Sequence, residues 1–127
     1  MEGLSLEQIG PLRLWVSRGH RFGTDAFLLA DFARVRQGER ACDLCSGCGI
    51  LPALWFREGP FPQAAWGVEL MEEPFRLMER TLEENPFLSG RFFPLHRDLR
   101  DLAGVLPAGA MDLVTCNPPY TPPGRCV

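Results

Sequence analysis

From residue 40 to residue 116 the chain alternates short apolar segments with helical patterns, and this alternation restricts the fold more than any other feature. The apolar segments predict β-strands at 40–44, 64–69, 91–95 and 111–116. A helix is expected over 50–57, and another from Pro74 onward, where Phe75, Met78 and Leu82 form one apolar stripe. Strands that alternate with helices form a parallel sheet through right-handed crossovers. The expected fold class is therefore α/β, with a doubly wound parallel sheet.

The N-terminal part precedes this alternation. Residues 12–16 alternate apolar and polar side chains, as a half-buried strand does. Thr24 or Asp25 is expected to cap a mostly apolar helix over 26–35, which ends before Gly38. We expect one domain, in which residues 1–37 add a strand and a helix to a cofactor-binding core formed by residues 38–127.

Composition excludes several classes of protein. The chain has 127 residues, 46% hydrophobic and 23% charged, which is typical of one globular domain. It contains no stretch of ~20 apolar residues and no export signal, so we expect a cytoplasmic protein without a membrane partner. The net charge of −3 argues against binding nucleic acid through bulk electrostatics alone.

The cysteines do not predict a metal site. Their number, 5, is odd, which is typical of reduced thiols in a cytosolic chain. Cys42, Cys45 and Cys48 have the spacing that begins an iron–sulfur motif, but Pro52 stands where the fourth cysteine would follow. We expect no metal, and we interpret these three cysteines as small buried residues.

Polar signals follow all four of the strands expected between residues 40 and 116. Ligands of such sheets bind at the carboxyl ends of the strands. The residues at those ends are Asp43 with Gly47 and Gly49, then Glu69, Asp98 and Asn117. Together these four ends predict a ligand site.

The loop after the first of these strands favours a particular cofactor. The third glycine of a dinucleotide fingerprint is replaced by Pro52, and the chain has no lysine for a phosphate-binding loop. An acid that could hold ribose hydroxyls, Glu69, follows about twenty residues after Gly49. An adenosine ligand without phosphates fits this pattern, and S-adenosylmethionine is such a ligand.

Three motifs carry a resemblance to a known family. Residues 43–50, Asp-Leu-Cys-Ser-Gly-Cys-Gly-Ile, resemble motif I of class I S-adenosylmethionine methyltransferases. Residues 117–120, Asn-Pro-Pro-Tyr, are similar to the catalytic motif of amino-group methyltransferases. Residues 19–33, beginning Gly-His-Arg-Phe-Gly-Thr-Asp, resemble the N-terminal signature of the bacterial family that methylates N6 of an anticodon-loop adenine in valine tRNA. The resemblance extends from about Leu4 to Tyr120.

The resemblance implies a Rossmann-like fold, S-adenosylmethionine as cofactor and tRNA as substrate. Glu69 would hold the ribose hydroxyls, and Asp43 would help to orient the methionine amine. Asp98 and Leu99 would contact the cofactor's adenine. The remaining cofactor-binding residues implied are Gly47 and Gly49 beneath the methionine portion and Thr24 and Asp25 near its amino-acid end.

The same resemblance implies a catalytic loop of Asn117, Pro118, Pro119 and Tyr120. The lone pair of adenine N6 is delocalised into the ring, so the amine is a weak nucleophile. The Asn117 side-chain carbonyl and the Pro118 backbone carbonyl would accept its two hydrogens and direct the lone pair at the methyl group. The prolines would stiffen the loop, and Tyr120 would stack on the target base.

Alternatives stay open at this point. Protein glutamine N5-methyltransferases share the Asn-Pro-Pro-Tyr loop, and a non-catalytic remnant would retain the same motifs. Complete class I methyltransferases have seven strands, whereas this pattern contains only the first four, so we expect an incomplete sheet. Its last strand, 111–116, would present an open edge. We therefore expect self-association through that edge and no methyl transfer by the purified chain.

Overall fold

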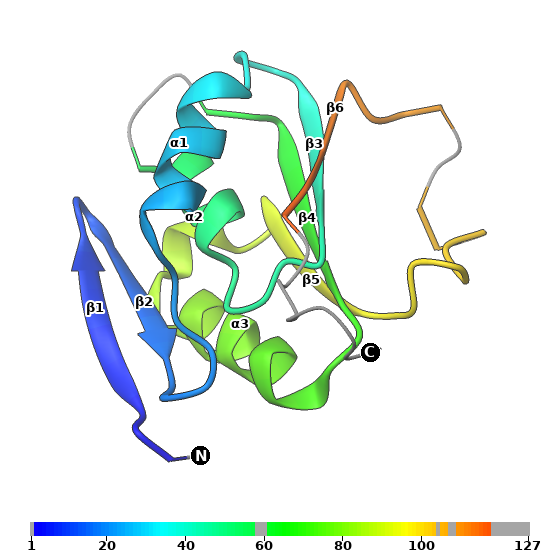
Figure 1. The fold of residues 1–127 in the computed structure, drawn as a ribbon. Helices are drawn as coiled ribbons and strands as arrows, with labels where there is room; N and C mark the ends of the chain where they lie inside the picture. The colour runs from blue at the N-terminus through cyan, green and yellow to red at the C-terminus, as the bar shows by residue number, and fades with distance from the viewer. Residues whose placement is uncertain (1, 58–60, 104, 107–108, 118–127) are drawn as a thin grey trace.

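A four-stranded parallel sheet forms the centre of the molecule (Figure 1). The computed structural model describes residues 2–57, 61–103, 105–106 and 109–117. The strands are β3 (Arg40–Leu44), β4 (Ala64–Glu69), β5 (Phe92–His96) and β6 (Leu113–Cys116), in the spatial order β5-β4-β3-β6. Every neighbouring pair is parallel. The order reverses between β3 and β6, as in a doubly wound fold, so the predicted fold class is confirmed.

The bounds of these strands agree closely with the prediction. β3 and β4 match it to the residue, β5 is shifted by one residue, and β6 begins at Leu113 rather than Met111. Within the described residues β6 pairs only with β3. Self-association through this edge stays a prediction.

The N-terminal strand belongs to a second sheet that the sequence analysis did not anticipate. β1 (Ser5–Ile9) and β2 (Leu12–Val16) form an antiparallel hairpin, in which Ile9 pairs with Leu12. The turn between them is left-handed at Gly10, where φ is 58°. Only β2 was predicted, because the polar side chains of β1 hide its alternation.

Side chains of a helix hold the free edge of this hairpin. Asn85 accepts a hydrogen bond from the Arg13 amide (3.0 Å) and donates one to the Arg13 carbonyl (2.7 Å). The Trp15 amide donates to the Thr81 hydroxyl at 2.9 Å. Thr81 lies in the last turn of α3 (Glu72–Glu84), and Asn85 directly follows this helix. The hairpin is thus attached to α3 by three hydrogen bonds between backbone and side chain.

The helices differ from the prediction mainly at their ends. α1 spans Thr24–Phe32 and α2 spans Ile50–Trp55, and the short 3-10 helix η1 (Pro86–Leu88) follows α3. The predicted N-cap at Thr24 or Asp25 is wrong, because Gly23 occupies that position without a side-chain cap. The α3 helix begins before Pro74, which lies in its first turn, where a missing N–H costs nothing.

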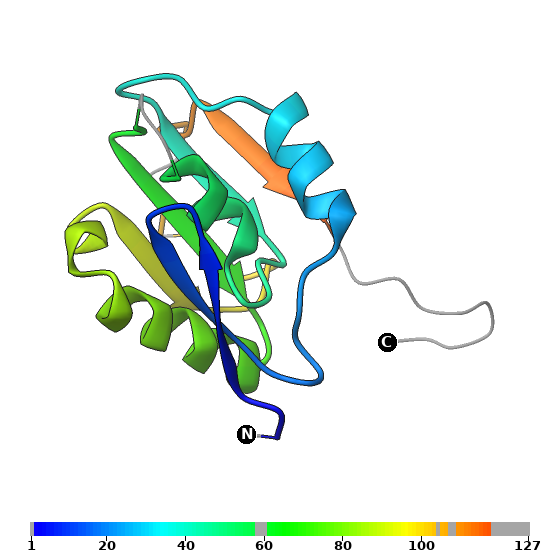
Figure 2. The same ribbon diagram turned by 90° about the vertical axis from the view of Figure 1, so that its left-hand side faces the viewer.

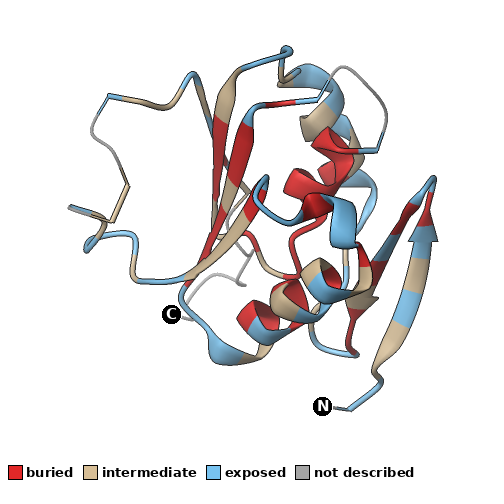
Figure 3. Cartoon of the chain, turned by 180° about the vertical axis from the view of Figure 1, so that it is seen from behind, coloured by how far each residue is buried: buried red, intermediate tan, exposed pale blue. Residues whose placement is uncertain are grey.

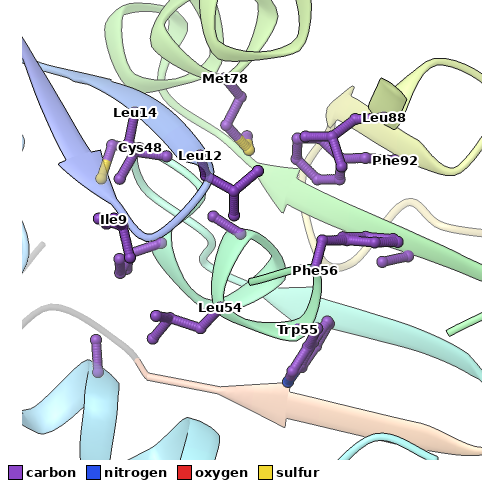
Figure 4. Close-up of a cluster of buried hydrophobic side chains, with 14 of the residues drawn as sticks. Ile9, Leu12, Leu14, Cys48, Leu54, Trp55, Phe56, Met78, Leu88 and Phe92 are labelled. Carbon is purple, nitrogen blue, oxygen red and sulfur yellow. The ribbon is translucent and has the colours of Figure 1, made fainter. Parts of the chain in front are cut away.

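The described helices lie on one face of the sheet, and the segment from β5 to β6 passes along the other (Figure 1). All six residues of α2 are buried, since this helix packs against α1, β2, β3 and β4. Buried positions concentrate on the inner strands and α2, whereas β1 alternates partly buried and exposed residues before the buried Ile9 (Figure 3). Figure 4 shows the core between the layers, where Leu12 and Leu14 of β2 face side chains such as Phe56, Met78 and Phe92.

No helix among the described residues has the length and apolar character required to cross a membrane.

Candidate functional site

Two adjoining cavities lie at the carboxyl ends of the parallel strands. The larger is about 480 Å³ and the smaller about 300 Å³. Cys45, Glu69 and Leu70 line both. Of the residues predicted to form the site, the larger cavity is lined by Asp25, Asp43, Gly47, Glu69 and Asn117, and the smaller by Glu69, Asp98 and Leu99. The chain therefore brings together most of the side chains singled out from the sequence, at the edge where parallel sheets bind ligands.

The glycine-rich loop from β3 to α2 contains two left-handed glycines with different surroundings. Gly47 has φ 60°, and a Cβ there would meet no heavy atom within 4 Å. Gly49 has φ 88°, and its Cβ would lie 2.8 Å from Cγ of the buried Met78. Gly47 thus leaves space on the cavity side, whereas Gly49 is required by packing against α3. Gly49 is absent from the described cavity lining.

Glu69, the last residue of β4, joins this loop to the start of α3. One carboxylate oxygen accepts the Gly47 amide at 2.8 Å, and the other accepts the Met71 amide at 2.9 Å. The side chain is buried. Each oxygen retains a free lone pair, so the carboxylate can still accept hydroxyl groups of a ligand. Glu69 is therefore both a ligand-facing group and part of the loop's support.

Asp43 is a buried carboxyl group in β3. It accepts a hydrogen bond from the Thr115 hydroxyl of β6 at 2.7 Å. Burial raises the pKa of Asp43 to about 6, the Thr115 bond lowers it in part, and the nearby Glu69 charge raises it. A cationic group in the cavity would favour the ionised form of this carboxyl.

Asp98 and Leu99 line the smaller cavity after β5. The Asp98 carboxylate is held by the Arg100 guanidinium at 2.7 and 3.1 Å and by the Arg100 amide at 2.9 Å. These hydrogen bonds lower the pKa of Asp98 to about 2. Leu99 is 39% exposed, so an apolar ligand surface would find an accessible partner here.

The end of β6 meets the first turn of α1 (Figure 2). There the Asn117 side-chain amide donates to Asp25 Oδ2 at 3.0 Å. Thr24 is exposed and is not among the described lining residues. Pro118, Pro119 and Tyr120 lie outside the described residues.

Several lining residues had no predicted role. His20 lines the larger cavity, and its Nε2 lies 2.9 Å from Glu73 Oε2. Cys45, interpreted as a buried residue, is partly exposed and has a left-handed φ of 57°. Burial raises the pKa of the Cys45 thiol to about 11, and the neighbouring Cys116 thiol adds to the shift. Only the position of Cys45 directly after a strand could have indicated its place in the cleft.

Among the described residues, no group of three or more histidine, cysteine, aspartate or glutamate side chains has the arrangement needed to hold a metal ion.

Comparison with known proteins gives relatives of two kinds. The chain is 27% identical over 104 residues to the tRNA1(Val) (adenine(37)-N6)-methyltransferase of Pasteurella multocida, covering 82% of this chain and 43% of the relative. It is 25% identical over 103 residues to the protein of the same name from Proteus mirabilis, covering 81% and 40%. It is 29% identical over 118 residues to the ribosomal protein uL3 glutamine methyltransferase of Bordetella pertussis, covering 81% and 38%. The chain thus spans less than half the length of these relatives. No family model matches the sequence.

Several solved structures have the same fold. The P. horikoshii TYW2 structure in complex with MeSAdo matches with a TM-score of 0.69 and 15% identity, covering 90% of this chain and 42% of that one. The M. jannaschii tRNA m1G37 methyltransferase matches with a TM-score of 0.63 and 15% identity, covering 79% and 30%. These comparisons confirm the resemblance found in the motifs: the chain is homologous to proteins named tRNA1(Val) (adenine(37)-N6)-methyltransferase and has the Rossmann-like fold of methyltransferases.

Proposed function

We propose that this chain is part of an enzyme that transfers a methyl group from S-adenosylmethionine to N6 of an adenine in tRNA. One observation carries the proposal. Asn117, which begins the Asn-Pro-Pro-Tyr segment, lines the same cavity as Asp43, Gly47 and Glu69. A group that can hold a target amine therefore shares one cleft with groups that can hold a cofactor.

The residues of the two cavities fit S-adenosylmethionine. Glu69 offers two carboxylate oxygens to the ribose hydroxyls, and the open space beside Gly47 accommodates the chain that links ribose to methionine. The buried Asp43 carboxyl provides a counter-charge for the methionine ammonium, and Leu99 lines the smaller cavity, where an adenine ring would pack. When bound, the cofactor supplies an electrophilic methyl group on a positively charged sulfur.

Asn117 would act on the amine that receives this methyl group. Its carboxamide oxygen accepts one amine hydrogen, which localises the nitrogen lone pair and directs it into the cleft. Correct alignment supplies much of the rate, because the reaction needs no covalent intermediate on the protein. By the motif resemblance, the Pro118 carbonyl would accept the second hydrogen and Tyr120 would stack on the base.

The substrate is inferred from the two relatives named for adenine 37 of tRNA1(Val). The residues 19–33, which resemble that family's signature, contribute Gly19, His20, Arg21, Phe22 and Gly23 to the larger cavity. The substrate signature and the cofactor cleft are therefore adjacent. A tRNA substrate would place the reaction in the cytoplasm.

A second candidate is methylation of a protein glutamine. The similarity to the uL3 glutamine methyltransferase supports it, because a carboxamide nitrogen has the same need for hydrogen acceptors as adenine N6. The two candidates differ in the acceptor molecule and share the same cleft.

Labelled methyl transfer tests the proposal. Because the purified chain alone is expected to transfer no methyl group, it is first extended with the missing strands taken from the Pasteurella multocida relative. This extended chain is incubated with methyl-labelled S-adenosylmethionine and either unmodified valine tRNA or ribosomal protein uL3. Label in N6-methyladenine is the expected result, and Asn117→Ala should reduce it about 100-fold with unchanged cofactor affinity. Gln8→Ala, which removes an exposed carboxamide on the remote hairpin, is the control. Label in uL3 alone would favour the second candidate, and cofactor binding without transfer to either would indicate a non-catalytic remnant.

A further inference from the structure

The contact between Asp25 and Asn117 connects two parts of the molecule that are 92 residues apart in sequence. Asp25 lies in the first turn of α1, and Asn117 directly follows β6. Their side chains meet at 3.0 Å, with Nδ2 as donor and Oδ2 as acceptor, and both residues line the larger cavity. The contact is solvent-exposed, so it contributes little to the core and needs another explanation.

The chemistry of this pair fixes the direction of the Asn117 amide. A carboxamide has a donor end and an acceptor end of nearly equal shape, and rotation by 180° exchanges them. A carboxylate can only accept hydrogen bonds, so the NH₂ end of Asn117 must face Asp25. The oxygen end must then point away from Asp25, where an incoming amine can reach it.

The local sequence holds the Asp25 carboxylate in this place. A Cβ at Gly23 would lie 3.1 Å from Asp25 Oδ1, so glycine leaves room for the carboxylate to turn back over the start of α1. Negative charge is also favoured there, because the first amides of a helix have no backbone partners. The acceptor is therefore held before any substrate arrives.

We propose that Asp25 is a positioning residue that holds the Asn117 carboxamide with its oxygen directed at the target amine. This inference rests on the proposed methyl transfer and differs from a role in holding the cofactor. A residue that only bound the cofactor's amino-acid end would affect cofactor affinity. A residue that orients Asn117 affects the transfer step at saturating cofactor.

The closest test is Asp25→Asn, which keeps the shape of the side chain and adds a donor. Either end of Asn117 can then face position 25, so the fixed orientation is lost. Asp31→Asn is the matched control, since Asp31 is an exposed carboxylate of the same helix that pairs with Arg34. Asp25→Ser serves as a second variant, so that a folding defect in one variant does not decide the outcome.

Three measurements are made on each variant. Heteronuclear NMR follows solvent exchange of the Asn117 side-chain amide, which is assigned by its absence in Asn117→Ala. Calorimetry gives the S-adenosylmethionine affinity, and single-turnover assays of the extended chain at saturating cofactor give the transfer rate to tRNA. We expect Asp25→Asn and Asp25→Ser to speed amide exchange at least fivefold and to slow transfer at least tenfold. Cofactor affinity should change less than twofold, and Asp31→Asn should match the unmodified chain.

The result that overturns the proposal is unchanged amide exchange in both Asp25 variants. A tenfold loss of cofactor affinity with an unchanged transfer rate would also overturn it and assign Asp25 to the cofactor. The NMR measurement needs neither cofactor nor tRNA. If the unmodified extended chain neither binds cofactor nor transfers methyl groups, the proposed function fails, and amide exchange still decides whether Asp25 orients Asn117.

Discussion

The two sides of the cleft are built differently. On the side formed by β3 and β4, Glu69 fixes the loop through two backbone amides, and Asp43 is buried against Thr115. On the side formed by α1 and β6, an exposed hydrogen bond between Asn117 and Asp25 joins the two elements at the cavity. The carboxylates on the first side are integrated into the fold, whereas Asp25 and Asn117 on the second side are joined by one exposed hydrogen bond.

This difference indicates how the two sides should respond to mutation. Changes on the β3–β4 side should alter stability and ligand binding together, since the same atoms serve both. Changes on the α1–β6 side should alter chemistry with little effect on stability. Four predictions on the free energy of unfolding test this contrast.

Glu69→Ala should have the largest combined effect, because it should lower both stability and cofactor affinity. It leaves the Gly47 and Met71 amides without their acceptor, so the free energy of unfolding should fall by about 3 kcal/mol. Cofactor affinity should fall at least tenfold. Urea unfolding and calorimetry measure the two effects. Glu79→Ala, which removes an exposed partner of Arg76, should cost under about 0.5 kcal/mol. Equal stability of the two variants would contradict the structural role of Glu69.

The paired glycines give the second test. Gly49→Ala combines a left-handed φ with a 2.8 Å approach to Met78, so it should cost about 2–4 kcal/mol. Gly47→Ala meets only the backbone strain and should cost about 1 kcal/mol. Thermal and urea unfolding of both variants check the order. If Gly47→Ala were the more destabilising, the assignment of Gly49 to packing would fail.

Asp43 should make the stability of the ligand-free chain depend on pH. Its pKa is about 6 in the folded state against an ordinary value of 3.8, so the folded state binds the proton more tightly. Asp43 therefore adds most to the free energy of unfolding at low pH. This contribution is lost as the pH rises from about 4 to about 6, and the total loss is up to about 3 kcal/mol. Urea unfolding across this range measures the slope. Asp43→Asn should remove it, and an unchanged slope would assign it to other groups.

Asn117→Ala should have the smallest effect on stability, under about 0.5 kcal/mol, because it breaks one exposed hydrogen bond. Thermal unfolding checks this value alongside the methyl-transfer assay. A loss above 2 kcal/mol would show that the α1–β6 side is as integrated as the β3–β4 side.

The sequence predicted best those strands whose apolar pattern matches their buried position in the sheet. β3 and β4 are short apolar runs covered on the helical face, and their bounds were predicted to the residue. The polar residues after them lie at one edge because parallel strands all end there. β1 was missed because its pairing depends on β2 and the turn at Gly10 rather than on its own apolar pattern.

Contacts over long sequence separation could not be predicted. No local pattern shows that Asp25 faces Asn117, or that Gly49 accommodates Met78. The motif resemblance selected Asp25 and Gly49 for cofactor binding, but the geometry gives each a neighbour within the chain. Spacing identifies which residues reach the cleft edge, and only the packed structure shows what each one contacts there.

The attachment of the hairpin to α3 also determines its register. The Arg13 and Trp15 amides point toward α3, where Asn85 and Thr81 accept them in place of a third strand. A slip of one residue would turn both amides away from these acceptors and move Leu12 and Leu14 out of the core. The same contacts occupy an edge that another chain could otherwise extend. Amide hydrogen exchange at Arg13 and Trp15 therefore reports the opening of the C-terminal end of α3, so the hairpin and this helix should unfold as one cooperative unit.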